Sequence, residues 1–221
     1  TAVALRVSVI TAPVRLLLAG TMILGAFTGL LYLLAYWAEH PQFFFPFVFF
    51  VLFLIVWAAL GNKAPDVEKL RAGYGRRLGA FLGTRYVLGG ETQSGVDCSG
   101  LARAALCEAM VKQGITQANS RLLGPMFWKF WWRDMTTRDL NGGKYGYTRV
   151  IGHAPKLAGF DTRKLKLGDM AVADGLHVLV YYGNGQWIEA SPDEQRVVVN
   201  RATPASRRPW FNTPVTLVRW W

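Results

Sequence analysis

Two long hydrophobic runs without a charged residue occupy the first part of the chain, at residues 16–37 and 43–60. Each is close to the ~20 apolar residues that a membrane-spanning helix requires. A short polar connection containing His40 separates them, so residues 1–62 are expected to form an antiparallel membrane hairpin with His40 in its loop. A cleavable signal peptide is the alternative for the first run, and a buried core hairpin is the alternative for both.

The pattern changes after residue 62 to the shorter periods of a folded domain, which we assign to residues 63–221. A helical period predicts one helix from a cap at Asp66 to about Leu82, and a second directly after Cys98. Downstream, alternation of hydrophobic positions predicts a strand–turn–strand unit, a hairpin at Gly183-Asn184-Gly185, and further strands. The last two strands start at Arg196 and Val215. The fold class expected is α+β, with a sheet of about five strands and the Cys98 helix packed on one face.

An insertion at about residues 113–163 interrupts this domain and is dense in tryptophan. Its aromatic residues are spaced as on one helical face, and Lys129 and Arg133 lie among them. Such a segment suits the membrane interface, a membrane protein partner, a roof over a cleft, or simple packing on the core. The aromatic residues concerned are Phe127, Trp128, Trp131 and Trp132.

The formal net charge of +11 comes from residues outside the two hydrophobic runs. A basic surface attracts nucleic acid, anionic lipid or an acidic polymer, but no nucleic-acid motif is present, so we expect no nucleic-acid partner. Basic residues precede the first run and follow the second, and the connection between the runs has none. For two spans, the positive-inside rule then predicts a multi-pass protein of the bacterial inner membrane with both termini in the cytoplasm.

Cys98 follows a glycine-rich turn and precedes a run of strong helix formers. A helix N-terminus directs unpaired N–H groups and the positive end of the helix dipole at such a thiol, which favours the nucleophilic thiolate. Burial as a small hydrophobe is the alternative. Cys107 is nine residues further along the same helix, a rise of ~13.5 Å, so the two thiols cannot form a disulfide there.

A thiol nucleophile needs a base and a group that orients the base. His177 begins a predicted strand, and the hairpin returns Glu189 beside it, so this pair supplies both. His153, in a segment punctuated by glycine and proline, is the second candidate for the base. No residue spacing indicates a metal site, and no cofactor is expected.

The motif Asp97-Cys98-Ser99-Gly100-Leu101, preceded by Tyr86 and Gly89-Gly90 and followed by Gly168-Asp169, His177-Val178 and Gly183-Asn184-Gly185, resembles the NlpC/P60 family of papain-like cysteine hydrolases. The resemblance covers roughly residues 66–200, with a gap in the middle. The order of cysteine before histidine is that of the standard family. The third catalytic position of the family is often His, Asn or Gln, and here Glu189 occupies it.

The resemblance implies a papain-like fold and cleavage of an amide bond in a peptidoglycan stem peptide. It implies that Tyr86, Asp97 and Ser99 hold the amino end of that stem, whereas Asp97 and Ser99 are also suited to cap the helix locally. Many family members act outside the inner membrane, which conflicts with the cytoplasmic side that the charges predict. A cytoplasm-facing thiol hydrolase or acyltransferase acting on lipid or protein is therefore an alternative, as is a structural subunit that retains the enzyme fold.

Overall fold

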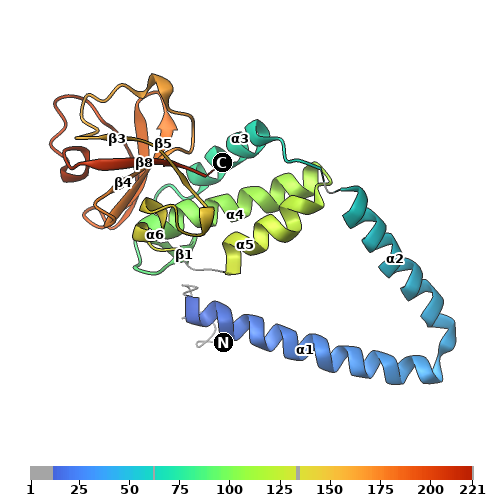
Figure 1. The fold of residues 1–221 in the computed structure, drawn as a ribbon. Helices are drawn as coiled ribbons and strands as arrows, with labels where there is room; N and C mark the ends of the chain where they lie inside the picture. Colours follow the sequence, from blue (N-terminus) through green and yellow to red (C-terminus); the bar gives the residue numbers. More distant parts are fainter. Residues whose placement is uncertain (1–11, 62, 133–134, 221) are drawn as a thin grey trace.

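The computed structural model describes residues 12–61, 63–132 and 135–220, and these form an arm of two helices followed by an α+β domain (Figure 1). The first residues of the predicted hairpin, its expected end at residue 62, and Arg133 of the tryptophan-rich segment lie outside the described residues.

The arm contains one helix long enough to cross a membrane, not two. Helix α1 spans Ala12–Glu39 and includes the apolar stretch Leu17–Trp37, whose residues are almost wholly exposed. A short 3-10 turn, Pro41–Phe43, takes up the start of the second run, and helix α2, Phe44–Leu60, has 17 residues. That length rises only about 26 Å, less than the ~30 Å of a bilayer core. Among the described residues only α1 is long and apolar enough to cross a membrane, so the structure does not support the predicted second span or the multi-pass location.

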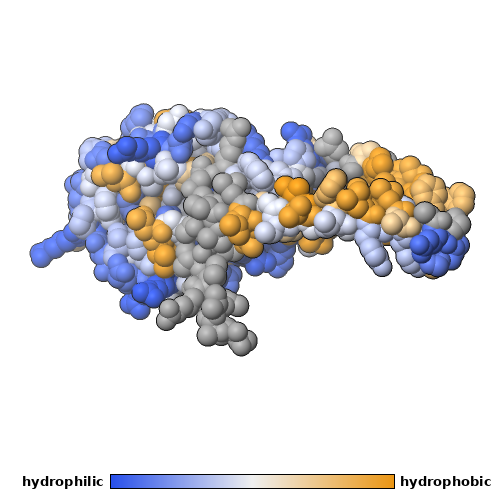
Figure 2. All heavy atoms as spheres, turned by 90° about the horizontal axis from the view of Figure 1, so that it is seen from below, coloured by the Kyte–Doolittle hydropathy of each residue, from blue (hydrophilic) through white to orange (hydrophobic). Residues whose placement is uncertain are grey.

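Helices α1 and α2 diverge from their turn and do not lie side by side as in the expected antiparallel hairpin (Figure 1). Aromatic rings join them near the turn, where Trp37 contacts Phe44 and Phe47 at centroid distances of 5.7 and 4.5 Å. Beyond it their large apolar side chains are mostly exposed, with Phe49 at 71% and Met22 at 75%. Figure 2 shows this arm as a largely hydrophobic projection from a mostly hydrophilic domain.

The helical half of the domain is built around α4, Cys98–Thr116, against which α3, Val67–Ala80, packs. Helix α3 begins where the sequence predicts, because the Asp66 side chain accepts a hydrogen bond from the Lys69 N–H at 3.0 Å. The small hairpin of β1 and β2 precedes α4, and shorter helical segments follow it. Their bounds are Glu91–Thr92 (β1), Gly95–Val96 (β2), Leu122–Met126 (a π-helical turn), Phe127–Trp132 (α5), Thr137–Asn141 (α6) and Lys144–Gly146 (a 3-10 turn).

The main sheet has six antiparallel strands in the order β3-β8-β4-β5-β6-β7, one more than expected. Their bounds are Arg149–Ala154 (β3), Met170–Ala173 (β4), His177–Gly183 (β5), Gln186–Ser191 (β6), Arg196–Arg201 (β7) and Val215–Arg219 (β8). The sequence did not indicate β3, because Gly152 interrupts it, Pro155 follows it and it has little hydrophobic alternation. It is an edge strand that pairs with β8 through a register shift between Val150 and Gly152.

Side chains of the sheet alternate between two separate hydrophobic cores, as the period of two requires. Val178, Val180 and Ile188 face α4 and join the larger core. Leu179, Tyr181 and Trp187 face the opposite side, where Phe211 of the loop between β7 and β8 covers them. This loop includes the 3-10 turn Pro209–Phe211. Residues of β5 and β6 whose side chains point to the same face as Leu179, Tyr181 and Trp187 therefore lie beneath that loop.

A buried carboxylate ties α3 to the sheet. Asp169, fully buried, accepts two 2.6 Å hydrogen bonds from Arg219 of β8, and Arg71 of α3 lies 4.0 Å away. The Arg71 guanidinium also donates to the Leu167 carbonyl at 3.0 Å. The Gly168-Asp169 motif thus has a structural role in joining the two halves of the domain.

Candidate active site

Cys98 is the first residue of α4, and tight local packing places it there. A Cβ on Gly100 would lie 2.2 Å from the Gly90 carbonyl oxygen, so only glycine allows the preceding turn to approach the helix this closely. The Asp97 carboxylate caps the helix by accepting from the Gly100 N–H at 2.7 Å. It also accepts from the Gly89 N–H at 2.7 Å and the Ser99 hydroxyl at 3.0 Å. Asp97 and Ser99 therefore do form the local cap that the sequence suggested as one alternative.

The thiol of Cys98 is held neutral by its surroundings. Its residue is only 8% exposed. Burial, with a smaller effect from the Asp97 charge, raises the pKa of Cys98 to about 12, and this outweighs the backbone N–H groups of Val178, Ser99 and Cys98 that favour the thiolate. The helix N-terminus favours the thiolate, as expected, but loss of hydration costs the anion more than those donors return. A base must remove the proton.

His177 and Glu189 form a buried pair, as the hairpin predicted. His177 Nε2 lies 2.6 Å from Glu189 Oε2, and the residues are 2% and 1% exposed. Because a carboxylate can only accept, the proton of a neutral imidazole resides on Nε2, which leaves Nδ1 as the acceptor. The N–H of Val178, the next residue, favours the Cys98 thiolate, so the start of β5 lies at the thiol.

Tyr86 also lies near the thiol. Its N–H donates to the Gln195 carbonyl at 2.9 Å, which fixes the segment before the β1–β2 hairpin against the sheet. Burial raises the pKa of Tyr86, and the charges of Cys98 and Asp97 raise it further, because all three groups are near one another. The structure thus gathers the expected substrate-binding positions Tyr86, Asp97 and Ser99 around Cys98.

Two residues that sequence reasoning did not assign to the site complete it, and both come from the loop after β7. Arg208 Nη1 donates to Glu189 Oε1 at 3.2 Å, and Arg208 Nη2 pairs with Glu194. The Trp210 ring stacks on His177, with centroids 4.6 Å apart and planes inclined by 22°. A loop rich in arginine and proline gave no local signal for these contacts, since they depend on how the loop crosses the sheet.

The other two histidines lie away from this centre. His153 is an exposed residue of β3, paired with Thr216 of β8, and two strands separate β3 from β5. His40 lies at the turn of the arm, where its ring is 4.4 Å from that of Tyr36. Both histidines therefore lie outside the site around Cys98, and His177 stays the predicted base.

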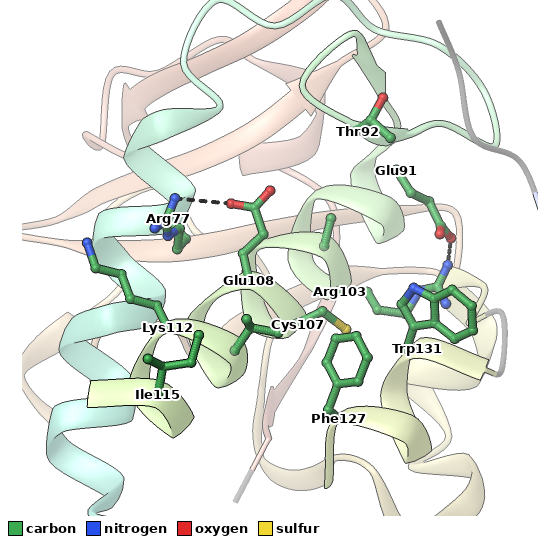
Figure 3. A pocket seen from close by; sticks show the side chains of 12 residues that line it. Arg77, Glu91, Thr92, Arg103, Cys107, Glu108, Lys112, Ile115, Phe127 and Trp131 are labelled. Atoms are coloured by element: carbon green, nitrogen blue, oxygen red, sulfur yellow. Dashed lines mark hydrogen bonds and ion pairs between the residues drawn. The ribbon is translucent and has the colours of Figure 1, made fainter. Parts of the chain in front are cut away.

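The tryptophan-rich segment divides between core and surface. Phe130 is 5% exposed and packs on Tyr147 and Trp220, as expected for a core anchor. Trp128 and Trp132 are about half exposed. The remaining pair, Phe127 and Trp131, lines a cavity of about 580 Å³ between α4 and α5 (Figure 3).

Similar solved structures include the NlpC/P60 domain of the peptidoglycan hydrolase SagA (23% identity, TM-score 0.40, covering 67% of this chain and 97% of that one). Another is NlpC2 from Trichomonas vaginalis (18% identity, TM-score 0.44, covering 73% of this chain and 50% of that one). A third is the peptidoglycan hydrolase RipB from Mycobacterium tuberculosis (24% identity, TM-score 0.39, covering 69% of this chain and 67% of that one). No protein with a curated description matches the chain. The profile of the NlpC/P60 family matches residues 83–214, which include the helix of Cys98 and the strands of His177 and Glu189, and the chain therefore belongs to the NlpC/P60 family.

Proposed function

We propose that the protein is a cysteine hydrolase that cleaves an amide bond, with Cys98 as nucleophile, His177 as base and Glu189 as the group that orients the base. The observation that carries the proposal is the buried 2.6 Å contact between His177 and Glu189, at the strand start that adjoins the Cys98 thiol. Family membership supports a hydrolase role. The substrate class, a peptidoglycan stem peptide, follows from the family resemblance.

In the reaction, Cys98 Sγ attacks the scissile carbonyl carbon while its proton passes to His177 Nδ1. The Cys98 N–H stabilises the oxyanion at the start of the helix. Collapse of the tetrahedral intermediate breaks the C–N bond, and the imidazolium returns the proton to the leaving amine. Water then hydrolyses the thioester with His177 again as base. Since the resting thiol is neutral, proton transfer accompanies attack and no thiolate–imidazolium pair needs to form beforehand.

Tyr86, Asp97 and Ser99 are proposed to hold the amino end of the stem peptide. Two of the three also cap α4, so their substitution affects the helix as well as the substrate. Tyr86 gives the cleaner test, because its side chain is not part of the cap. Tyr86→Phe should raise KM for a free stem peptide more than it lowers kcat.

Membrane association is proposed to occur through the exposed apolar helices of the arm, of which α1 alone is long enough to span. With a single span, the flanking charges predict the opposite side of the membrane for the domain. Arg6 and Arg15 precede the apolar stretch Leu17–Trp37 of α1. The 20 residues after Trp37 contain Glu39 but no Lys or Arg. The positive-inside rule then places the N-terminus in the cytoplasm and the domain outside, where peptidoglycan is. A compartment-specific reporter fused after Trp221 tests this, and a cytoplasmic signal would instead favour the alternative of a cytoplasm-facing hydrolase or acyltransferase.

The hydrolase proposal is tested by incubating the full chain and its Cys98→Ala variant with muropeptides and analysing the products by mass spectrometry. Turnover by the wild type and none by the variant is expected. Turnover retained in Cys98→Ala would refute the mechanism. A wild-type protein that neither cleaves peptides nor reacts with a thiol-directed probe at Cys98 would favour the structural-subunit alternative.

A further inference from the structure

The cavity between α4 and α5 is separate from Cys98 and lies on the face of α4 that points away from the main sheet. Its apolar lining consists of Ala104, Cys107, Val111 and Ile115 on α4 and Phe127 and Trp131 on α5, and we name it the α4 trough. Its volume of about 580 Å³ falls within the range of small-molecule sites. The positions on α4 recur every three or four residues, so they form one stripe, about 16 Å long from Ala104 to Ile115. An elongated apolar group fits such a stripe.

Charged groups line the trough along one side and at both ends (Figure 3). Arg103 pairs with Glu91 at the closed end near β1, and Arg77 pairs with Glu108 at 3.4 Å along one side. Lys112 is exposed near the opposite end and forms no ion pair with the carboxylates of the described residues. Three cations therefore face two carboxylates, and the excess positive charge is at the end where Lys112 lies. An anionic group complements that end.

The open end of the trough adjoins the root of the apolar arm. Ile115 is 66% exposed there. One turn further along, the Ser120 N–H donates to the Gly61 carbonyl and the Asn119 side chain donates to the Lys63 carbonyl, both at 3.1 Å, so the end of α2 is fastened to the end of α4. A bilayer that holds the arm therefore meets the domain at the mouth of the trough.

We propose that the α4 trough holds one acyl chain of an anionic phospholipid drawn from the bilayer in which the arm lies. The chain would pack along Val111 and Ile115 on α4 and against Phe127, while the headgroup remains at the bilayer surface near Lys112. Such a chain removes the apolar lining of the trough from water, which is the driving force for its entry, since the chain itself is already out of water in the bilayer. The lipid orients the domain on the membrane at a site remote from the thiol, since Cys107 is about 13.5 Å along α4 from Cys98.

The test uses the full chain in phosphatidylcholine nanodiscs that contain a phosphatidylglycerol with a photoreactive diazirine at the end of one acyl chain. Cross-linked peptides are identified by mass spectrometry. We expect labelling of the α4 and α5 residues that line the trough, as well as of the arm, and weaker trough labelling from a phosphatidylcholine probe of the same chain. Equal labelling by the two probes would overturn the assignment of an anionic lipid.

Val111→Trp should fill the trough and lower its labelling about tenfold, the loss expected when roughly two buried methylene groups lose their contacts. Labelling of the arm should not change. Ala72→Trp, which adds the same side chain at an exposed position of α3, should have no effect. Trough labelling that persists in Val111→Trp would contradict the proposal.

A charge reversal that leaves the apolar lining intact provides a second, milder test. Lys112→Glu should reduce trough labelling by the anionic probe, whereas Lys164→Glu, on an exposed turn outside the trough, should not. Labelling confined to the arm in the wild type would refute the trough site alone, and no labelling of either part would also refute the proposed membrane association. The hydrolase proposal is independent of both outcomes, because muropeptide cleavage is measured separately.

Discussion

The contact of Arg208 with the His177–Glu189 pair gives the sharpest test of the site. Glu189 uses one oxygen for His177 and the other for Arg208, and it is buried. The guanidinium thus offsets the negative charge that would otherwise stabilise a protonated imidazole. Arg208→Gln should leave a buried carboxylate whose partner is the imidazole alone, so the carboxylate should stabilise positive charge on the imidazole more strongly.

The structure sets the size of this effect. Arg208 Nη1 and His177 Nε2 contact different oxygens of the Glu189 carboxylate, so these two nitrogens are no more than about 8 Å apart. Two unit charges at that separation repel by about 2 kcal/mol at an effective dielectric constant near 20, which corresponds to roughly 1.5 pH units. The Arg208 side chain is 31% exposed, so solvent screens part of the interaction. We expect a shift of about one pH unit.

The assay is the pH dependence of Cys98 alkylation by iodoacetamide, followed by peptide mass spectrometry so that Cys107 is scored separately. The neutral imidazole must accept the thiol proton, so the rate of Cys98 alkylation should fall on the acid side. The midpoint of that fall should move upward by about one pH unit in Arg208→Gln. Arg208→Lys, which keeps the charge but not the planar fork, should move it less.

Arg207→Gln is the matched control, because it removes the same charge from the adjacent exposed residue. Its midpoint should coincide with that of the wild type. An unchanged or lowered midpoint in Arg208→Gln, with the fold retained by circular dichroism, would refute the electrostatic reasoning.

Three further predictions concern stability. The pKa of the buried Cys98 thiol is about 12, against 9.0 for a free thiol, so its neutral form stabilises the fold fully below about pH 9. Between pH 9 and 12 this stabilisation is lost, by up to about 1.4 kcal/mol per pH unit. The free energy of unfolding in urea should therefore decline less steeply with alkaline pH in Cys98→Ala than in the wild type. Gly100→Ala places a Cβ 2.2 Å from the Gly90 carbonyl oxygen and should cost about 1–3 kcal/mol; an unaltered melting temperature would argue against this close approach. Asp169→Ala leaves the Arg219 guanidinium without its buried carboxylate and should cost roughly 3–5 kcal/mol; a loss below about 1 kcal/mol in urea unfolding would contradict that role.

Local patterns in the sequence were sufficient for much of the fold and for the central pair. The cap at Asp66 predicted the start of α3, since a cap involves residues only three positions apart. The Gly183-Asn184-Gly185 turn predicted that β6 returns alongside β5, and with it that Glu189 meets His177. Each of these features depends on interactions within one element or one hairpin, which residue order largely determines.

The tertiary structure decided what depends on contacts between distant segments. The sequence placed Cys98 at a helix start, but the protonation of its thiol depends on how many segments bury it. Arg208 and Trp210 reach the site because their loop crosses the outer face of the sheet, and no local pattern specifies that crossing. The sixth strand and the α4 trough likewise arise from pairing and packing between elements. Hydrophobic period reports which face of an element is apolar, but only the assembled fold determines what that face meets.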